Sequence, residues 1–485
     1  MTVMNVKINL LKPLFVLISV SVLLRFFSFF PSVVNHDEST YIQIAYEMLH
    51  GKTYFVDVID TKPVGIFLIY GFFQTLAGDS IFLFRLFTAI WIAVTALGIF
   101  AVTFKISNER ISAWTAGILY ILATSIFTFY GVSPNTELFF NVFTIWAFYL
   151  IIEKQDWWRM AIAGLLLGFA FLVKYVIVVE ALVFGFYILW QSKKRKGNWL
   201  AGFPLGFCMA LFFFIPLISV YMWYYLAGHE KELLFYTFEL PGRYPVDRSI
   251  SGLALFYLDF FGRYFPITIL VILAIKNGRK HFGNIFFLLL SWLAADLLIA
   301  GWSGKNFGHY LLQALPVFCI LAGIGLIANP VFIKKIRSLK PKVIWGAGII
   351  FFLLYSLAHK TEYFDKEDLP KKIALKMRGK LKRSDNIYTG NYQHILYFLL
   401  HKQSPTAYVH RSLIWDEHHS DMLEIDLEQE AKKILSQNPK FILLKEPVPA
   451  NPVADSIIKY YKPVDTIDGK IFIYNRKTDT TNLPD

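Results

Sequence analysis

Charged residues are scarce in this chain. Of its 485 residues, 17% are Asp, Glu, Lys or Arg, whereas 56% are hydrophobic and 18% are aromatic. A soluble domain carries about a quarter charged residues, so this deficit excludes an ordinary soluble protein and predicts a membrane protein. Cysteine is almost absent as well. Cys208 and Cys319 both lie in apolar runs, so the chain has neither a disulfide framework nor a metal–thiolate spacing.

Negative charge is the scarcer sign, since 35 acidic residues face 48 Lys and Arg and leave a net charge of +13. In a soluble protein such an excess would suggest a nucleic-acid partner. Here the basic residues gather in short segments between apolar runs, where they set membrane topology and favour anionic lipid head groups. We therefore expect membrane lipids, and no nucleic acid, as partners.

Apolar segments of about the length that crosses a bilayer recur along the chain. Residues 160–190 are apolar except for Lys174 and Glu180. A single helix there would be about 46 Å long, against a hydrocarbon core of about 30 Å, so we divide this run at Lys174. The sequence then predicts about eleven spans, at residues 13–31, 81–104, 112–130, 136–152, 159–174, 175–191, 199–222, 253–275, 283–301, 310–329 and 343–359.

The basic segments predict the orientation of these spans. No small-residue cleavage site precedes Asp37, so the first apolar run is expected to stay as a span. With the N-terminus inside, the basic stretches 193–198, 276–280 and 334–342 all fall on the inner side, as membrane topology requires. The same count places Asp37, Glu137, Lys174 and His309 on the outer side.

Three polar segments are expected outside the membrane. In the first outer loop, residues 32–80, apolar side chains at helical spacing predict an interfacial helix at 39–50. The second, residues 223–252, mixes apolar and polar residues and predicts another such helix before a Pro/Gly turn. After residue 359, "DNIYTG", "KFILLK" and "GKIFIYNR" read as strands, and "YQHILYFLLHKQ" and "DLEQEAKKILSQ" as helices. We predict a transmembrane module at 1–359 and a small extracytoplasmic α/β domain at 360–485.

Charged residues collect at the predicted outer ends of the spans. Asp37 and Glu38 open the first loop, where acids also serve simply as a helix N-cap. Lys62 precedes Pro63 near the next apolar segment. The alternative to a functional role is a lysine that snorkels to the membrane surface. Lys174 is harder to explain in that way, because a lysine at full depth costs about 2.5–3.5 kcal/mol. Acids and bases on one face of a membrane bundle indicate a site, to which Glu137, Lys305 and His309 also belong. Glu180 and Asp296 lie deeper, and the sequence does not pair them.

These motifs resemble those of the GT-C membrane glycosyltransferases over roughly residues 30–330. The similar groups are the protein O-mannosyltransferases and the lipid A aminoarabinose transferases, in which an acid pair opens the first loop and a helix ends at Gly before Lys-Pro. Here "DESTYIQIAYEMLHG" and "TKPVGIFLIYGFFQTLAGDSIFLFRL" carry that order. "SPNTELFF" looks like the second acidic loop, "FLVKYV" like the segment with a phosphate-binding lysine, and "GHYLLQALP" like a late outer loop. The corresponding residues are Asp37-Glu38, Gly51, Lys62-Pro63, Ala77-Gly78, Arg85, Glu137 and Lys174.

The resemblance implies an inverting enzyme that takes a sugar from undecaprenyl or dolichyl phosphate, with Asp37 as base toward the acceptor. The chemistry fits, because the phosphate leaving group needs cations and an attacking hydroxyl benefits from a carboxylate. Thr40, Thr61 and Glu137 depart from the aminoarabinose-transferase pattern, which leaves the acceptor and any divalent cation open. We expect catalytic roles for Asp37, Glu38 and Glu137, donor-phosphate contacts from Lys62, Lys174, Lys305 and His309, and loop-structuring roles for Tyr41, Pro63 and Arg85.

Two other function classes compete with this interpretation. A transporter or flippase for lipid-linked sugars would also place charge inside a membrane bundle, but it should show internal repeats and helices broken at mid-bilayer. No repeat is evident, and the charges lie at the outer ends. An assembly subunit that binds a partner through its outer domain would not need acids at the openings of two loops. We therefore predict a glycosyltransferase of the plasma (inner) membrane that acts at the extracytoplasmic face on a lipid, glycan or protein acceptor.

Overall fold

The computed structural model describes residues 9–126, 131–243 and 249–477. The chain divides into two compact units. The first, here called the helical unit, comprises Met1–Phe29, Arg85–Trp223 and Val246–Asp365. The second, here called the mixed unit, comprises Phe30–Phe84, Tyr224–Pro245 and Lys366–Asp485. The first outer loop and the C-terminal residues therefore belong to one unit, although most of the apolar helices lie between them in the sequence.

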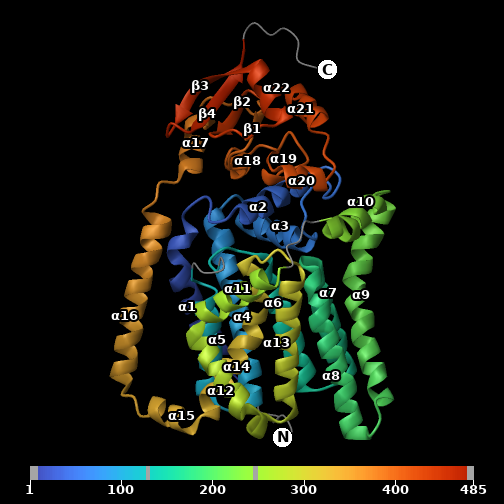
Figure 1. Ribbon diagram of the computed structural model, residues 1–485, viewed down its shortest axis with the longest axis vertical. Coiled ribbons are helices and arrows are strands. Elements are labelled where there is room, and N and C mark those ends of the chain that lie inside the picture. The colour runs from blue at the N-terminus through green and yellow to red at the C-terminus, as the bar shows by residue number, and fades with distance from the viewer. Residues whose placement is uncertain (1–8, 127–130, 244–248, 478–485) are drawn as a thin grey trace. The chain divides into compact units, whose positions relative to one another are not determined.

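Long apolar helices make up the helical unit (Figure 1). Short 3-10 turns or loops join them, as expected for segments that must satisfy every backbone group within the bilayer. The helices are α1 (Leu11–Arg25), α4 (Ile81–Ser107), α5 (Arg110–Ala123), α6 (Thr136–Glu153), α7 (Trp157–Val173), α8 (Val178–Lys196), α9 (Phe203–Leu226), α11 (Ile250–Arg263), α12 (Phe265–Phe282), α13 (Asn284–Trp302), α14 (Leu315–Ala328), α15 (Pro330–Arg337) and α16 (Pro341–His359), with the 3-10 segments η1 (Phe26–Phe29), η3 (Tyr175–Ile177), η4 (Leu200–Gly202) and η7 (Gly308–Ala314), and the π-helix η8 (Lys360–Phe364).

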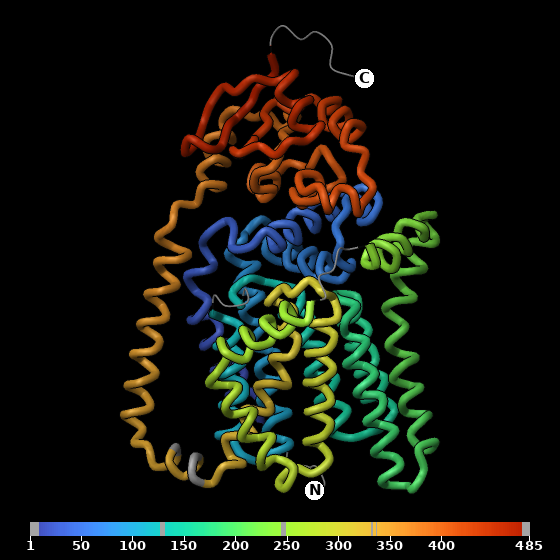
Figure 2. The backbone as a smooth tube through the Cα atoms, in the orientation of Figure 1, coloured from blue at the N-terminus to red at the C-terminus, as the bar shows by residue number. Residues whose placement is uncertain are grey.

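Each of the eleven predicted spans has a helical counterpart among the described residues. Within the described ranges, eight helices are long and apolar enough to cross a membrane, or nine if the bent pair α11–α12 is counted as one span. The counterparts of the predicted spans 112–130 and 159–174 are the shorter apolar helices α5 and α7. The predicted span 253–275 is not one straight helix: α11 and α12 meet at Tyr264 with a bend of 96° (Figure 2). Pro266 in the first turn of α12 accounts for the break, because proline cannot continue the hydrogen bonding of a preceding helix.

Helix α14 forms the centre of the helical unit. All of its residues except Ile327 are buried, and it packs against α12 and α5. Two glycines allow this close approach. A Cβ atom at Gly325 would lie 1.9 Å from the carbonyl oxygen of Leu270 on α12, and one at Gly323 would lie 2.6 Å from the carbonyl oxygen of Ser112 on α5. The backbones are therefore in direct contact, which small residues make possible in membrane bundles.

The mixed unit combines the first outer loop with the C-terminal residues. Its helices are α2 (His36–Leu49), α3 (Gly65–Ala77), α10 (Glu230–Leu234), α17 (Leu369–Arg378), α18 (Ile395–Leu399), α19 (Ser412–Trp415), α20 (Glu417–Met422), α21 (Leu427–Ser436) and α22 (Pro452–Tyr460), with the π-helix η5 (Phe235–Glu239) and the 3-10 turn η6 (Leu240–Arg243); its strands are β1 (Ile387–Tyr388), β2 (Phe441–Lys445), β3 (Tyr461–Ile467) and β4 (Ile471–Arg476). The division into a transmembrane module at 1–359 and a C-terminal domain at 360–485 remains a prediction.

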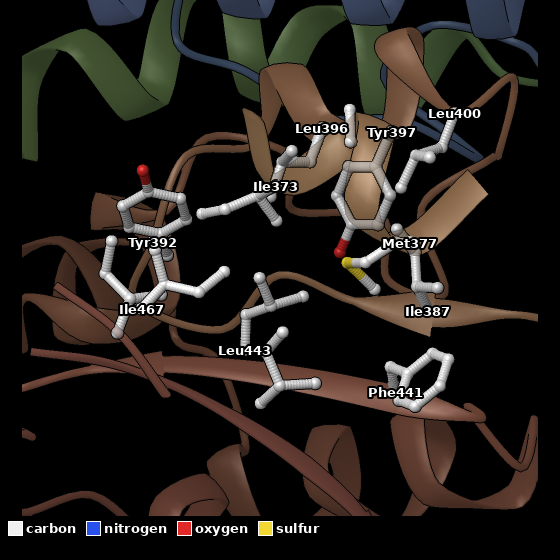
Figure 3. Packing of buried hydrophobic residues seen from close by; sticks show 13 residues of the cluster. Ile373, Met377, Ile387, Tyr392, Leu396, Tyr397, Leu400, Phe441, Leu443 and Ile467 are labelled. Atoms are coloured by element: carbon white, nitrogen blue, oxygen red, sulfur yellow. The ribbon is translucent and has the colours of Figure 1, made fainter. Parts of the chain in front are cut away.

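The four strands form one sheet in the order β1-β2-β4-β3. Strand β1 is parallel to β2, while β4 is antiparallel to both β2 and β3. Alternate residues of β2 enter two apolar clusters, because successive side chains of a strand point to opposite faces. Phe441 and Leu443 pack with residues of α17 and α18 (Figure 3), and Ile442 and Leu444 pack with residues of α21 and α22. Both faces of the sheet are thus covered.

The predicted helix at 39–50 is confirmed as α2, but its surroundings differ from the prediction. Its residues 38–47 are all buried, and it packs against α3 and α18 instead of presenting one face to lipid. The second outer loop gives the short α10 followed by η5 and η6, and part of the predicted turn, residues 244–248, lies outside the described residues. Its residues join the mixed unit, where the Tyr224 hydroxyl donates to the Tyr54 carbonyl at 2.7 Å.

Gly325→Ala should destabilise the protein, because the added methyl group overlaps the Leu270 carbonyl. Overpacking of this kind costs typically about 1–3 kcal/mol. We expect a lower thermal unfolding midpoint in detergent. Gly346→Ala on α16 is the control, since nothing lies within 4 Å of its Cβ position and the change should be neutral or slightly stabilising. Equal midpoints for the two variants would contradict the proposed backbone contact.

Candidate active site

Asp37 lies in the first turn of α2. The side chain of Asn35 caps this helix and accepts a hydrogen bond from the Asp37 backbone N–H at 2.8 Å. One carboxylate oxygen of Asp37, Oδ1, lies 3.1 Å from Lys62 Nζ, and a quarter of the Asp37 side chain is exposed. Glu38, the second acid of the motif, is buried. The acids therefore do stand at a helix N-terminus, and Asp37 in addition meets a cation from a separate segment.

Lys62 is held between two acids and a ring. Its ammonium group lies 3.4 Å from Asp60 Oδ2 and 5.6 Å from the ring centroid of Tyr41. The carbonyls of Asp60 and Lys62 share the single proton of the Tyr54 hydroxyl in a three-centre hydrogen bond, which restrains the backbone of this turn. Pro63 follows and restricts the conformation of Lys62 before α3 begins. These constraints leave 22% of the lysine side chain exposed beside Asp37.

A histidine group from the C-terminal residues adjoins Asp37, and sequence reasoning did not find it. His410 Nε2 lies 4.0 Å from Asp37 Oδ1. His394 Nε2 lies 2.9 Å from Thr40 Oγ1 on α2, and Arg411 Nη2 lies 3.3 Å from His36 Nε2. No local motif connects residue 410 to residue 37, so only the fold reveals this neighbourhood.

The three imidazoles are neutral near pH 7. Burial, aided by the positive charge of Arg411, lowers the pKa of His36 to about 4. Burial likewise holds the pKa of His394 well below its ordinary value and lowers the pKa of His410. The charged partner of Asp37 in this group is therefore Lys62, with which it forms an ion pair.

A second cluster lies within the helical unit, at the end where α6 begins and α7 ends. Glu137 is in the first turn of α6 and is fully buried. Lys174, in extended conformation between α7 and η3, forms an ion pair with it and lies 3.8 Å from the ring centroid of Tyr310. His309 packs edge-on against the same ring. The predicted residues Glu137, Lys174 and His309 are thus brought together.

The remaining predicted residues have other surroundings. Lys305 lies in the loop between α13 and η7, where its backbone N–H donates to Ser303 Oγ at 3.4 Å. Arg85 is buried, and its guanidinium donates to the Ser28 carbonyl at 2.8 Å. Tyr41 is buried against Phe67 and Tyr70. Among the described residues, no group of three or more His, Cys, Asp or Glu side chains is placed to hold a metal ion.

The two deep acids are paired through an amide. Gln313 Nε2 donates to Glu180 Oε1 and to Asp296 Oδ1, each at 3.1 Å, and all three side chains are buried. Gln313 belongs to η7, the segment that also carries His309 and Tyr310. This bridge could not be predicted from the sequence, because Gln313 lies in the largely apolar stretch "GHYLLQALP".

Comparisons with known proteins identify the fold that carries these residues. A family model described as dolichyl-phosphate-mannose-protein mannosyltransferase matches residues 61–223. The crystal structure of ArnT from Cupriavidus metallidurans bound to undecaprenyl phosphate superposes with a TM-score of 0.66, at 15% identity, over 96% of this chain and 98% of that chain. The chain has the GT-C fold. The archaeal oligosaccharyltransferase of Archaeoglobus fulgidus, tethered with an acceptor peptide, matches with a TM-score of 0.51 at 13% identity, over 97% of this chain and 74% of that chain.

The resemblance to the GT-C superfamily is therefore confirmed, as is the predicted polytopic helical fold with a small C-terminal sheet. The family model spans Lys62, Glu137 and Lys174, whereas Asp37 precedes the matched residues. A comparison with curated proteins finds no match. Together, the apolar helices and the fold matches indicate an integral membrane protein with the GT-C fold.

Proposed function

We propose that this GT-C protein is an inverting glycosyltransferase that moves a sugar from a polyprenyl phosphate to an acceptor on the extracytoplasmic side of the plasma membrane. The observation that carries the proposal is the nearly full-length fold match to ArnT, whose structure holds undecaprenyl phosphate. The matched family, named for dolichyl phosphate mannose, supports the same donor class. Such a transfer requires a base for the acceptor and a cation for the leaving phosphate, and each cluster offers a candidate for one of these roles.

Asp37 is proposed as the general base. In the transfer, the acceptor oxygen attacks the anomeric carbon, its proton passes to Asp37, and the bond from carbon to phosphate oxygen breaks with its electrons leaving on the phosphate. One base and an ordered leaving group suit inversion in a single displacement, whereas a retaining mechanism needs a carboxylate nucleophile. Asp37 is accessible, since a quarter of its side chain is exposed, and Lys62 orients its carboxylate. General base catalysis contributes about 10²–10⁴ in rate.

Lys174 is proposed to bind the donor phosphate. Its ammonium group is already held by Glu137 and by the ring of Tyr310, so little ordering is needed when an anion approaches. A fixed cation that meets the charge developing on a leaving phosphate lowers the barrier to its departure. The exposed apolar side chains of the membrane helices offer the setting for a prenyl chain. Lys305 lies in the loop between α13 and η7, and His309 lies in η7. Contacts from these two residues to the donor phosphate remain part of the proposal.

Asp37→Asn should lower the rate of transfer by about 10²-fold or more, because the amide cannot accept the acceptor proton. The product is defined as the envelope glycolipid or glycoprotein that mass spectrometry finds in cells with the gene and not in deletion cells. Its initial rate of formation is measured in membrane vesicles. Asp57→Asn, at an exposed acid of the same loop, should retain the normal rate. Wild-type transfer by Asp37→Asn would remove the base assignment.

Lys174→Met should weaken binding of undecaprenyl phosphate by about tenfold or more, since the anion loses its cation. Bound ligand raises the unfolding temperature, so affinity can be read from thermal shifts of the purified protein. The single variant leaves Glu137 buried without its ion pair, which by itself is destabilising. The double variant Lys174→Met/Glu137→Gln removes that charge and serves as the stability control. If the double variant binds undecaprenyl phosphate as tightly as the wild type, Lys174 is not a phosphate ligand.

The proposed orientation can be tested with single cysteines, because Cys208 and Cys319 are both buried. Lys462→Cys on β3 and Lys194→Cys on α8 are exposed positions expected on opposite sides of the membrane. A membrane-impermeant maleimide should label position 462 in intact cells and position 194 only after permeabilisation. The reverse pattern would place the sheet in the cytosol and overturn the extracytoplasmic site.

A further inference from the structure

The segment that carries His410 is joined to the loop of Lys62 by backbone pairing. The Ile59 N–H donates to the Ala407 carbonyl at 2.8 Å, and Ile59 and Tyr408 form an isolated parallel bridge. Such pairing fixes the register of two extended segments. His410 lies two residues after Tyr408 on one segment, and Lys62 lies three residues after Ile59 on the other. The position of the imidazole beside Asp37 is therefore built into the backbone.

The hydrogen bonds of His410 define its tautomer. The Ser412 backbone N–H donates to His410 Nδ1 at 3.3 Å, and Ser412 Oγ lies 2.7 Å from the same nitrogen. Because a backbone N–H can only donate, Nδ1 carries the lone pair. In the neutral imidazole the proton then resides on Nε2. Nε2 is the nitrogen that faces Asp37 Oδ1, at 4.0 Å.

The neighbours of His410 favour this neutral, donating form. Burial lowers its pKa, and among the charges that act on it, those of Lys62 and Arg411 oppose a third cation while those of Asp37 and Asp60 partly compensate. The ring of His394, itself neutral and in contact with α2, lies 5.3 Å away between centroids. His36 packs beyond it. His410 thus faces Asp37 as an N–H donor, and Lys62 approaches the same oxygen.

We propose that His410 is a positioning residue for Asp37: its Nε2–H and the Lys62 ammonium together orient the carboxylate through Oδ1 for proton transfer. The inference rests on the proposed role of Asp37 as base. A separation of 4.0 Å exceeds a hydrogen bond, and such contacts often shorten only when substrate is bound. Because Nε2 already carries a proton, His410 does not take the proton that Asp37 accepts. The C-terminal part of the chain thereby completes the machinery around the first outer loop.

The test uses three substitutions in the full-length protein. Gln places an amide N–H near the position of Nε2, Asn places it near that of Nδ1, and Phe has no donor. We expect His410→Gln to retain transfer within a few-fold of wild type. We expect His410→Asn and His410→Phe to lose between about 10- and 100-fold in rate, the range expected from misplacing a catalytic group. Undecaprenyl phosphate affinity and the unfolding midpoint should change little in all three variants.

A surface histidine supplies the control. His401 also faces a carboxylate, Asp79 at 3.4 Å, but half of its side chain is exposed, so His401→Phe should transfer normally. A purely structural role for His410 predicts equal losses in the Gln and Phe variants together with a lower unfolding midpoint, and that result would overturn the inference. The inference on His410 would also be overturned if His410→Phe transferred sugar at the wild-type rate while Asp37→Asn remained inactive. If Asp37→Asn is active, the proposed base itself fails, so the two failures are distinguishable.

Discussion

In a chain this apolar, an ionised side chain persists inside the protein only where an opposite charge or strong donors accompany it. This constraint shapes both candidate clusters. Lys174 is accompanied by Glu137 and an aromatic face, and Lys62 by Asp37 and Asp60. Each lysine is thereby immobilised before any ligand arrives. A cation preorganised in this way stabilises developing negative charge without the reorganisation that water would need.

The same constraint explains why histidine, and not further lysine, surrounds Asp37. The charged groups that act most strongly on His410 are two acids and two bases, so these four charges balance. Additional cations would make the net charge of this group positive, whereas neutral imidazoles add hydrogen-bond donors and acceptors without adding charge. With its pKa lowered to about 4, His36 keeps this neutral state throughout the pH range in which histidine ordinarily titrates. The mixed unit can therefore hold a polar, nearly charge-balanced environment around Asp37, the proposed base.

Sequence reasoning succeeded where the determining interactions are local. Apolar run length predicted a helix for every span, and the apolar side chains at helical spacing after Asp37 and Glu38 predicted α2. The bend between α11 and α12 was missed, although Pro266 was a local sign of it. Strand β3 was also missed, because "YKPVDTI" contains a proline and alternating polar residues; it forms at the edge of the sheet, with an irregularity between Pro463 and Asp465, where proline is tolerated. His410 and Gln313 could not be predicted, since their partners are determined only by tertiary packing.

Gln313 also links the deep acids to the proposed phosphate lysine. In a 3-10 helix, side chains three residues apart lie on the same side, so Tyr310 and Gln313 both project from one side of η7. Tyr310 meets Lys174, and Gln313 meets Glu180, six residues further along the same chain segment. The segment from Lys174 to Glu180 is therefore fastened to η7 at both ends, while Asp296 ties η7 to α13. Burying two carboxyl groups is costly, but the bridge through Gln313 links η7 to α8 and α13 by hydrogen bonds. A lysine held in a defined position is what the proposed stabilisation of the leaving group requires.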